Sequence, residues 1–147
     1  MKKLGRKNLP KKNLCFACGP ANPQGMHLKF HIDEARRRAS CTFRLGKRYT
    51  GPPAHCHGGI IATILDDAMG KLNKVYGVVA VTSKMTVEYL RPVPLYQRLQ
   101  VESRHVSRRG RRLKHVAEIR DRSGTVLARS QGVFIAIDPE KVFGIRL

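Results

Sequence analysis

The motif His57-Gly58-Gly59 has the residue types of a site that can hold a negative charge. Its two glycines stand where a capping residue or a good helix former would stabilise a helix start better, and glycine lets another group approach the backbone closely. The first turn of a helix presents unpaired N–H groups and the positive end of the helix dipole. If a helix begins here, the Gly58 N–H can therefore stabilise a developing oxyanion. Ordinary loop glycines are the alternative interpretation.

Asp66, eight residues after Gly58, is a candidate base or nucleophile. Asp66 and Asp67 interrupt an otherwise apolar segment, in a chain with only ten acidic residues. A carboxylate beside apolar neighbours can accept a proton or attack a carbonyl carbon if it is correctly oriented. On a helical wheel Asp66 lies on the side of Gly59 and Ala62, whereas Asp67 points about 100° away and is expected to be dispensable. A solvated helix face is the alternative for an isolated aspartate.

A helix over residues 57–73 is predicted to carry both candidates. Its apolar residues recur at helical spacing and form one stripe, Ile61, Ile64, Leu65, Ala68 and Leu72. Strands are predicted at 26–32 and 39–45, which form a hairpin, and at 79–89, 99–106, 113–120 and 126–137. In the strand 79–89, strict alternation predicts Val81 and Met85 on one face, with Thr82 and Lys84 on the other. This order of elements predicts an α+β domain, an antiparallel sheet wrapped around one long central helix.

The chain of 147 residues fits a single domain, and no repeat or linker divides it. Residues 14–138 are predicted to form the domain, residues 1–13 a basic flexible arm, and residues 139–147 a C-terminal tail. The arm has six Lys or Arg residues and no apolar core, so it lacks the features of a secretory signal. No apolar run approaches the ~20 residues that a membrane span needs. With four cysteines and no export signal, the sequence predicts a cytoplasmic protein.

The run from Gly51 to Asp67 closely resembles the active-site helix of hotdog-fold thioesterases. It is most similar to the thioesterase-superfamily-member acyl-CoA hydrolases and to their phenylacetate-pathway relatives. The run 81–94 resembles the strand that follows in the same enzymes, and the loop 15–26 resembles the N-terminal loop of many bacterial members. The resemblance covers about residues 15–137 and implies a hotdog fold. It also implies hydrolysis of an acyl-CoA thioester to the free acid and CoA, with no metal and no cofactor.

The resemblance implies a role for each matching residue. In that family the glycine at the position of Gly58 donates its N–H to the thioester oxygen, and the acid at the position of Asp66 activates water or attacks directly. A hydroxyl at the position of Thr82 helps to hold the water. Apart from the resemblance, His57 is a further catalytic candidate, although a structural role, orienting the loop through a ring hydrogen bond or filling space, is ranked ahead of proton transfer. Gly59 is a candidate substrate contact. Some members have an Asn or Gln before the motif, where this chain has a Gly-Pro-Pro-Ala stretch at 51–54.

The spacing of Gly58 and Asp66 also predicts an assembly. Eight residues of helix separate them by roughly 12 Å, too far for one carbonyl carbon to touch both. A symmetric pair of chains would bring Gly58 of one helix against Asp66 of the other and make two sites. The sequence therefore predicts a homodimer, or a dimer of dimers, in agreement with the architecture that the resemblance implies.

The formal net charge of +19 predicts an anionic partner. CoA phosphates, an acidic acyl carrier protein, nucleic acid and anionic lipid all have the right sign. Eight Lys or Arg residues fall within 104–122. Guanidinium groups from this stretch, and one before it, are the candidates for binding phosphates: Arg91, Arg108 and Arg109. A solvated hairpin end is the alternative explanation.

Two other functions stay open, a hotdog ligand-binding protein without catalysis and a basic nucleic-acid-binding protein. The enzyme is favoured because the reactive residues are all present. Nucleic acid is disfavoured because the chain has no helix-turn-helix motif and only nine aromatic residues that could stack on bases. A membrane partner is not expected.

Cys15 and Cys18 have the spacing of half a zinc site. The other ligands would have to come from Cys41, Cys56, His55 or His57, and no second Cys-x-x-Cys or His-x3-His pair appears. A redox dithiol is disfavoured because no helix clearly follows the pair. Since the loop of the resembling family carries the same cysteines without an implied metal, loop packing is the prediction.

Overall fold

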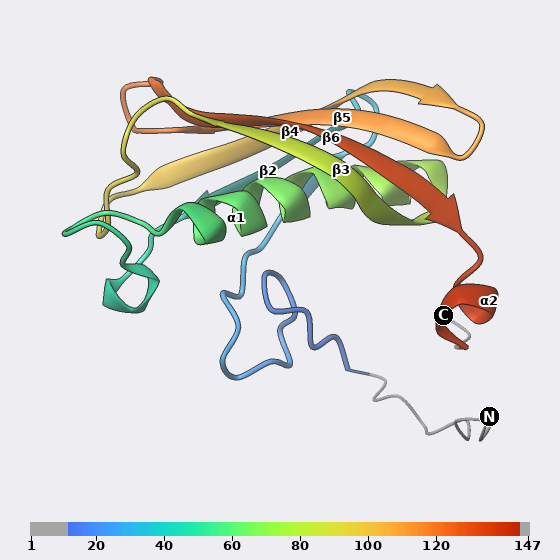
Figure 1. Ribbon diagram of the computed structural model, residues 1–147, viewed down its shortest axis with the longest axis horizontal. Helices are drawn as coiled ribbons and strands as arrows, with labels where there is room; N and C mark the ends of the chain where they lie inside the picture. The colour runs from blue at the N-terminus through green and yellow to red at the C-terminus, as the bar shows by residue number, and fades with distance from the viewer. Residues whose placement is uncertain (1–11, 145–147) are drawn as a thin grey trace.

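The computed structural model describes residues 12–144. The sheet has six strands: β1 (His31–Asp33), β2 (Arg38–Phe43), β3 (Val79–Tyr89), β4 (Leu99–Arg109), β5 (Arg112–Arg120) and β6 (Val126–Ile137). All pair antiparallel in the order β1-β2-β4-β5-β6-β3. The helix α1 (Gly58–Gly70) lies along one face of this sheet (Figure 1). The predicted α+β architecture is therefore confirmed. The predicted basic arm, except for its last two residues, lies outside the described residues.

Helix α1 forms because its apolar stripe faces the sheet. Ile64, Leu65, Ala68 and Met69 have no exposed surface, and Ile61 is nearly as buried. The helix is shorter than predicted, because Lys71–Tyr76 continues it as the 3-10 helix η2. Gly77 ends this segment at a positive φ of 62°, a conformation that suits glycine. Two further short helices are present, the 3-10 helix η1 (Lys47–Tyr49) and α2 (Pro139–Phe143). No helix within residues 12–144 is long and apolar enough to cross a membrane.

The predicted strand 26–32 is wrong for most of its length. Only its last two residues belong to β1. The backbone of the earlier part instead bonds to the cysteine-containing loop, with the Met26 N–H donating to Phe16 O (2.7 Å) and the Leu28 N–H to Ala17 O (2.9 Å). Because these backbone N–H groups bond to the loop, the segment does not pair with a strand and does not lengthen the sheet.

The predicted alternation along β3 is also wrong, because the strand contains a β-bulge. Its pairing with β6 shifts between Thr82 and Lys84, so that Ser83 is an extra residue. Thr82 therefore pairs with the buried Phe134 and lies on the face that α1 covers, while Val81 is 38% exposed. Beyond the bulge, Met85 and Val87 pack against the core. Bulges re-aim side chains in this way, often beside active sites.

The core contains one buried histidine, His115 on β5, which is 1% exposed. Its Nε2 lies 2.9 Å from Asn73 Oδ1, and because an amide oxygen only accepts, Nε2 carries the proton. The Nδ1 of His115 then accepts from Nδ1 of His105 at 3.2 Å. Burial, followed by the neighbouring His105, lowers the pKa of His115 to about 4.

Acidification should destabilise the fold through His115. The imidazole of His115 binds its second proton near pH 6.5 in the unfolded chain and only near pH 4 in the native chain. The free energy of unfolding is therefore highest above about pH 6.5, and it falls by up to about 3 kcal/mol as the pH drops toward about 4. The free energy of unfolding by urea between about pH 7 and about pH 4 should fall more steeply for the wild type than for His115→Gln. His31→Gln, at an exposed position, is the control. Equal slopes for wild type and His115→Gln would contradict this assignment.

Candidate active site

Asp66 and Thr82 meet between α1 and β3. The Thr82 hydroxyl donates to Asp66 Oδ1 at 2.7 Å, and Asp66 is half-buried. The bulge in β3 makes this contact possible. It follows directly after Thr82 and shifts the pairing with β6, so Thr82 can face α1 although the residues after the bulge keep their own alternation. Within residues 12–144, Oδ2 of Asp66 accepts no hydrogen bond. One carboxylate oxygen is thus held in place, and the other is available to a water molecule.

The N-terminus of α1 leaves one donor available. The Gly59 N–H donates to His57 Nδ1 (2.9 Å), and the N–H groups of Ile60 and Ile61 donate to His57 O. The Gly58 N–H, the first of the helix, has no acceptor among the described residues. It therefore has the free donor and the favourable helix dipole that an oxyanion needs.

His57 is the N-cap of α1. Because its Nδ1 accepts the Gly59 N–H, that nitrogen carries no proton, and the ring is fixed as the Nε2-protonated tautomer. This geometry favours the orienting role over proton transfer. Sequence reasoning missed Tyr89, whose hydroxyl donates to Gly58 O at 2.9 Å and whose ring lies beside the Gly58 Cα. An exposed tyrosine at the end of a strand gave no signal of this contact.

A family model described as the thioesterase superfamily matches residues 54–128, a segment that contains the whole of α1 as well as Thr82. The chain belongs to the thioesterase superfamily. The acyl-coenzyme A thioesterase THEM4 of Bos taurus is 32% identical over 127 residues, which are 86% of this chain and 52% of that protein. The chain thus spans about half the length of the curated relatives it matches.

Solved structures of other proteins share the fold. The protein RHA08564, a thioesterase superfamily protein, is 28% identical with a TM-score of 0.79, over 84% of this chain and 60% of that one. The E. coli PaaI protein of the phenylacetic acid degradation operon has a TM-score of 0.71 at 20% identity, over 77% of this chain and 81% of that one. The predicted hotdog fold is confirmed.

The predicted phosphate ligands of this thioesterase-superfamily chain lie at two ends of the molecule. Arg91 follows β3 at the Gly58 end, where its N–H donates to Leu127 O (2.9 Å). Arg108 and Arg109 close β4 at the opposite end of the sheet. The Arg108 guanidinium lies 5.5 Å from the centre of the Tyr76 ring. One chain alone does not bring these cations together. Gly59 lies beside the free Gly58 N–H, and its own N–H is occupied.

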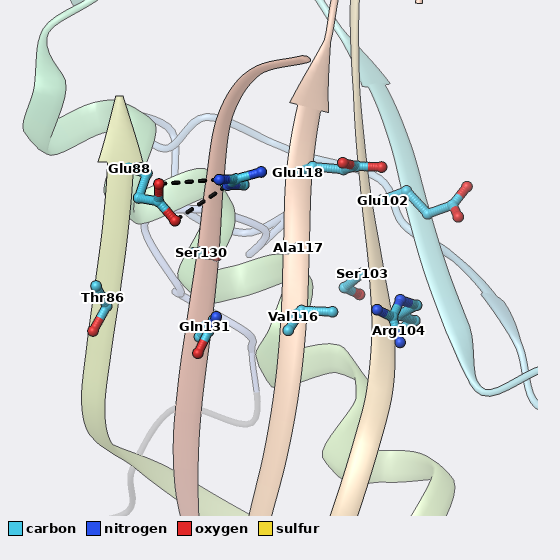
Figure 2. Close-up of a pocket in the computed structure, with 11 residues that line it drawn as sticks. Thr86, Glu88, Glu102, Ser103, Arg104, Val116, Ala117, Glu118, Ser130 and Gln131 are labelled. Carbon is cyan, nitrogen blue, oxygen red and sulfur yellow. Dashed lines mark hydrogen bonds and ion pairs between the residues drawn. The ribbon is translucent and has the colours of Figure 1, made fainter. Parts of the chain in front are cut away.

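A hollow on the outer face of the sheet lies away from the candidate site. Figure 2 shows it across strands β3, β6, β5 and β4, on the face opposite α1. Its surface is a row of charges that includes Glu102 and Glu118, and Glu88 pairs with Arg129 at 3.1 Å. Neither Asp66 nor Gly58 borders it. We therefore assign the candidate site to α1 and not to this hollow.

Asp67, the neighbour of Asp66 on α1, is largely buried. Its side chain is 17% exposed and faces the loop that carries Cys15 and Cys18. Burial raises the pKa of its carboxyl, an effect that the charge of Lys71 opposes. Asp67 therefore has a structural environment of its own, distinct from that of Asp66.

Proposed function

We propose that the protein hydrolyses an acyl-CoA thioester to the free acid and CoA. The contact between Thr82 and Asp66, on a helix whose N-terminus has a free Gly58 N–H, is the observation that carries this proposal. The name of the THEM4 relatives, acyl-coenzyme A thioesterase, supports the substrate class.

In the proposed reaction, Asp66 Oδ2 takes a proton from water while the water oxygen attacks the thioester carbonyl carbon. The carbonyl oxygen becomes an oxyanion, which the Gly58 N–H and the helix dipole stabilise. The intermediate then collapses: the C–S bond breaks, and the CoA thiolate leaves and takes up the proton. Thr82 keeps Asp66 Oδ1 occupied, so that Oδ2 is the oxygen that faces the water.

Each site would need two chains. Strand β3 is the edge of the sheet, eleven residues long, and one side of its backbone has no strand partner among the described residues. An exposed edge this long is a natural surface for pairing. Two β3 edges paired antiparallel about a two-fold axis would bring the Tyr89 end of one beside the Thr82 end of the other. Since Tyr89 contacts Gly58, this pairing would carry Gly58 of one chain toward Asp66 of the partner.

The same symmetry would unite the separated cations. A two-fold axis reverses the long direction of the partner, so the end with Arg91 in one chain would meet the end with Arg108 and Arg109 in the other. Guanidinium groups from both chains would then bind the phosphates of one CoA.

A complementation experiment tests this arrangement. Asp66→Asn and Gly58→Pro should each be nearly inactive alone, since each damages both sites of its own homodimer. Unfolded, mixed in equal amounts and refolded, they should recover about a quarter of wild-type activity, because half of the dimers are mixed and each has one intact site. Thiol release from an acyl-CoA is the measurement. Mixtures that are no more active than their components would rule out a site shared between chains.

A further inference from the structure

The loop that contains Cys15 and Cys18 lies on the side of α1 away from the sheet (Figure 1). It and the helix bring three metal-ligating side chains together. The ligand atoms of Cys15, Cys18 and Asp67 all lie within 4.8 Å of one another. Asp67 Oδ1 is 3.9 Å from Cys15 Sγ and 3.5 Å from Cys18 Sγ. The third ligand is thus an aspartate 49 residues further along the chain, which the spacing of cysteines and histidines could not indicate.

These separations fit a tetrahedral ion. Zinc bonds of about 2.3 Å to sulfur and about 2.0 Å to oxygen, at tetrahedral angles, separate the sulfur and oxygen ligands by about 3.5 Å. The Cys18–Asp67 separation has this value, and the Cys15–Asp67 separation exceeds it by a few tenths of an ångström. Only a small side-chain adjustment would be needed.

The loop is built to hold the two thiols on one side. The Gly19 N–H donates to Cys15 O (2.8 Å), which closes a tight turn between the cysteines. A Cβ at Gly19 would lie 2.4 Å from Cys15 N, so the turn requires glycine there. Bonds from residues 26 and 28 to the backbone at Phe16 and Ala17 fix the turn from its other side. The geometry of the pair is therefore set by the loop and not by a following helix.

The donor set has a net charge that a divalent ion would balance. Two thiolates and one carboxylate carry three negative charges, and the Lys71 ammonium, 2.7 Å from Cys18 Sγ and 3.9 Å from Asp67 Oδ2, supplies one positive charge. A divalent cation would supply the other two. Asp67 Oδ2 is buried and has no hydrogen-bond partner within the described residues, which is unusual for a carboxylate oxygen. A donor to a ligating thiolate is the role expected of Lys71 beside a metal.

We propose that Cys15, Cys18 and Asp67 form a structural site for a thiophilic divalent cation, with zinc the expected ion and solvent completing its coordination at the exposed Cys15. The site would fasten the N-terminal loop to α1 one residue beyond Asp66. It replaces the loop-packing interpretation of the two cysteines, and it does not depend on the proposed reaction.

Metal content of the full chain tests the proposal. The protein is purified under reducing conditions, incubated with Zn²⁺, dialysed and analysed for zinc. Wild type should retain about one ion per chain, while Cys15→Ser, Cys18→Ser and Asp67→Asn should retain at least about tenfold less. Cys56→Ser is the control, because it also removes one thiol, a buried one just before α1, and should retain zinc like the wild type. Zinc absent from the wild type, or retained equally by all variants, would overturn the proposal.

Cobalt keeps the test decisive if a variant fails to fold. Co²⁺ added to the reduced wild-type chain should produce the thiolate-to-cobalt charge-transfer absorption and the strong visible bands of a tetrahedral site, and Zn²⁺ should abolish both. Weak octahedral bands alone would refute the site. So would a Cys15–Cys18 disulfide found by mass spectrometry in the reduced preparation, which would assign the pair to redox chemistry instead.

Discussion

Replacing Asp66 by Asn should lower turnover by about 10²-fold or more and leave substrate binding nearly unchanged. Asn keeps the size of the side chain and can still accept the hydrogen bond from Thr82, which is 2.7 Å long in the wild type. It removes only the basic electron pair that takes the proton from water. The kcat and KM for an acyl-CoA, measured separately, distinguish this loss from a loss of binding.

Three further variants serve as comparisons for Asp66→Asn. Asp33→Asn makes the same substitution at the last residue of β1 and should leave kcat unchanged. Thr82→Ala should lose less than Asp66→Asn, because it only frees the carboxylate to rotate. Asp67→Asn should reduce metal content and stability more than turnover per folded molecule. If Asp67→Asn abolished turnover in a folded protein while Asp66→Asn did not, the assignment of the base would be wrong.

Gly58→Pro should lower turnover at least about 10²-fold relative to Gly58→Ala, the usual cost of losing one oxyanion donor. Gly58 is the first residue of α1, a position where proline is well tolerated because its N–H has no partner in the helix. His57, the preceding residue, has φ −62° and ψ 135°, which suits a residue before proline. The substitution therefore removes the donor and retains the helix.

Gly58→Ala is the matched comparison because it adds a side chain and keeps the N–H. Its Cβ would contact the Tyr89 ring at 3.5 Å or more, an ordinary van der Waals distance. Circular dichroism should show the same helix content for both variants. Equal turnover of the two, with both folded, would remove the Gly58 N–H from the mechanism.

Periodicity predicted the main elements because their packing is regular. The stripe on α1 and the alternation along β4 to β6 reflect burial against one shared core, so the sequence carried their pattern. Where the backbone hydrogen bonds run to a loop and not to a neighbouring strand, the alternation of apolar residues was misleading. Residues 26–30 alternate like a strand, yet their backbone pairs with the cysteine loop. Nothing in single-sequence periodicity distinguishes these two partners.

The site was predictable in part. A helix start with glycines and an acid two turns later could be recognised from the residues, but the contact of Thr82 with Asp66 depends on a bulge that contains no glycine or proline as a signal. The burial of His115 could have been predicted, since it falls on the same face of β5 as the buried Leu113, Ala117 and Ile119. The burial of Asp67 was not, because it arises from a loop distant in sequence.

The bulge in β3 acts like a one-residue frameshift within the strand. Before Ser83, the alternation of side chains points Thr82 toward the candidate active site. After Ser83, it points Met85 and Val87 into the core. The two halves can therefore vary in composition independently, but not in length. Losing Ser83 would restore strict alternation, and either Thr82 would turn away from Asp66 or Met85 and Val87 would turn out of the core. Among relatives of this chain, the number of residues here should vary far less than their identity.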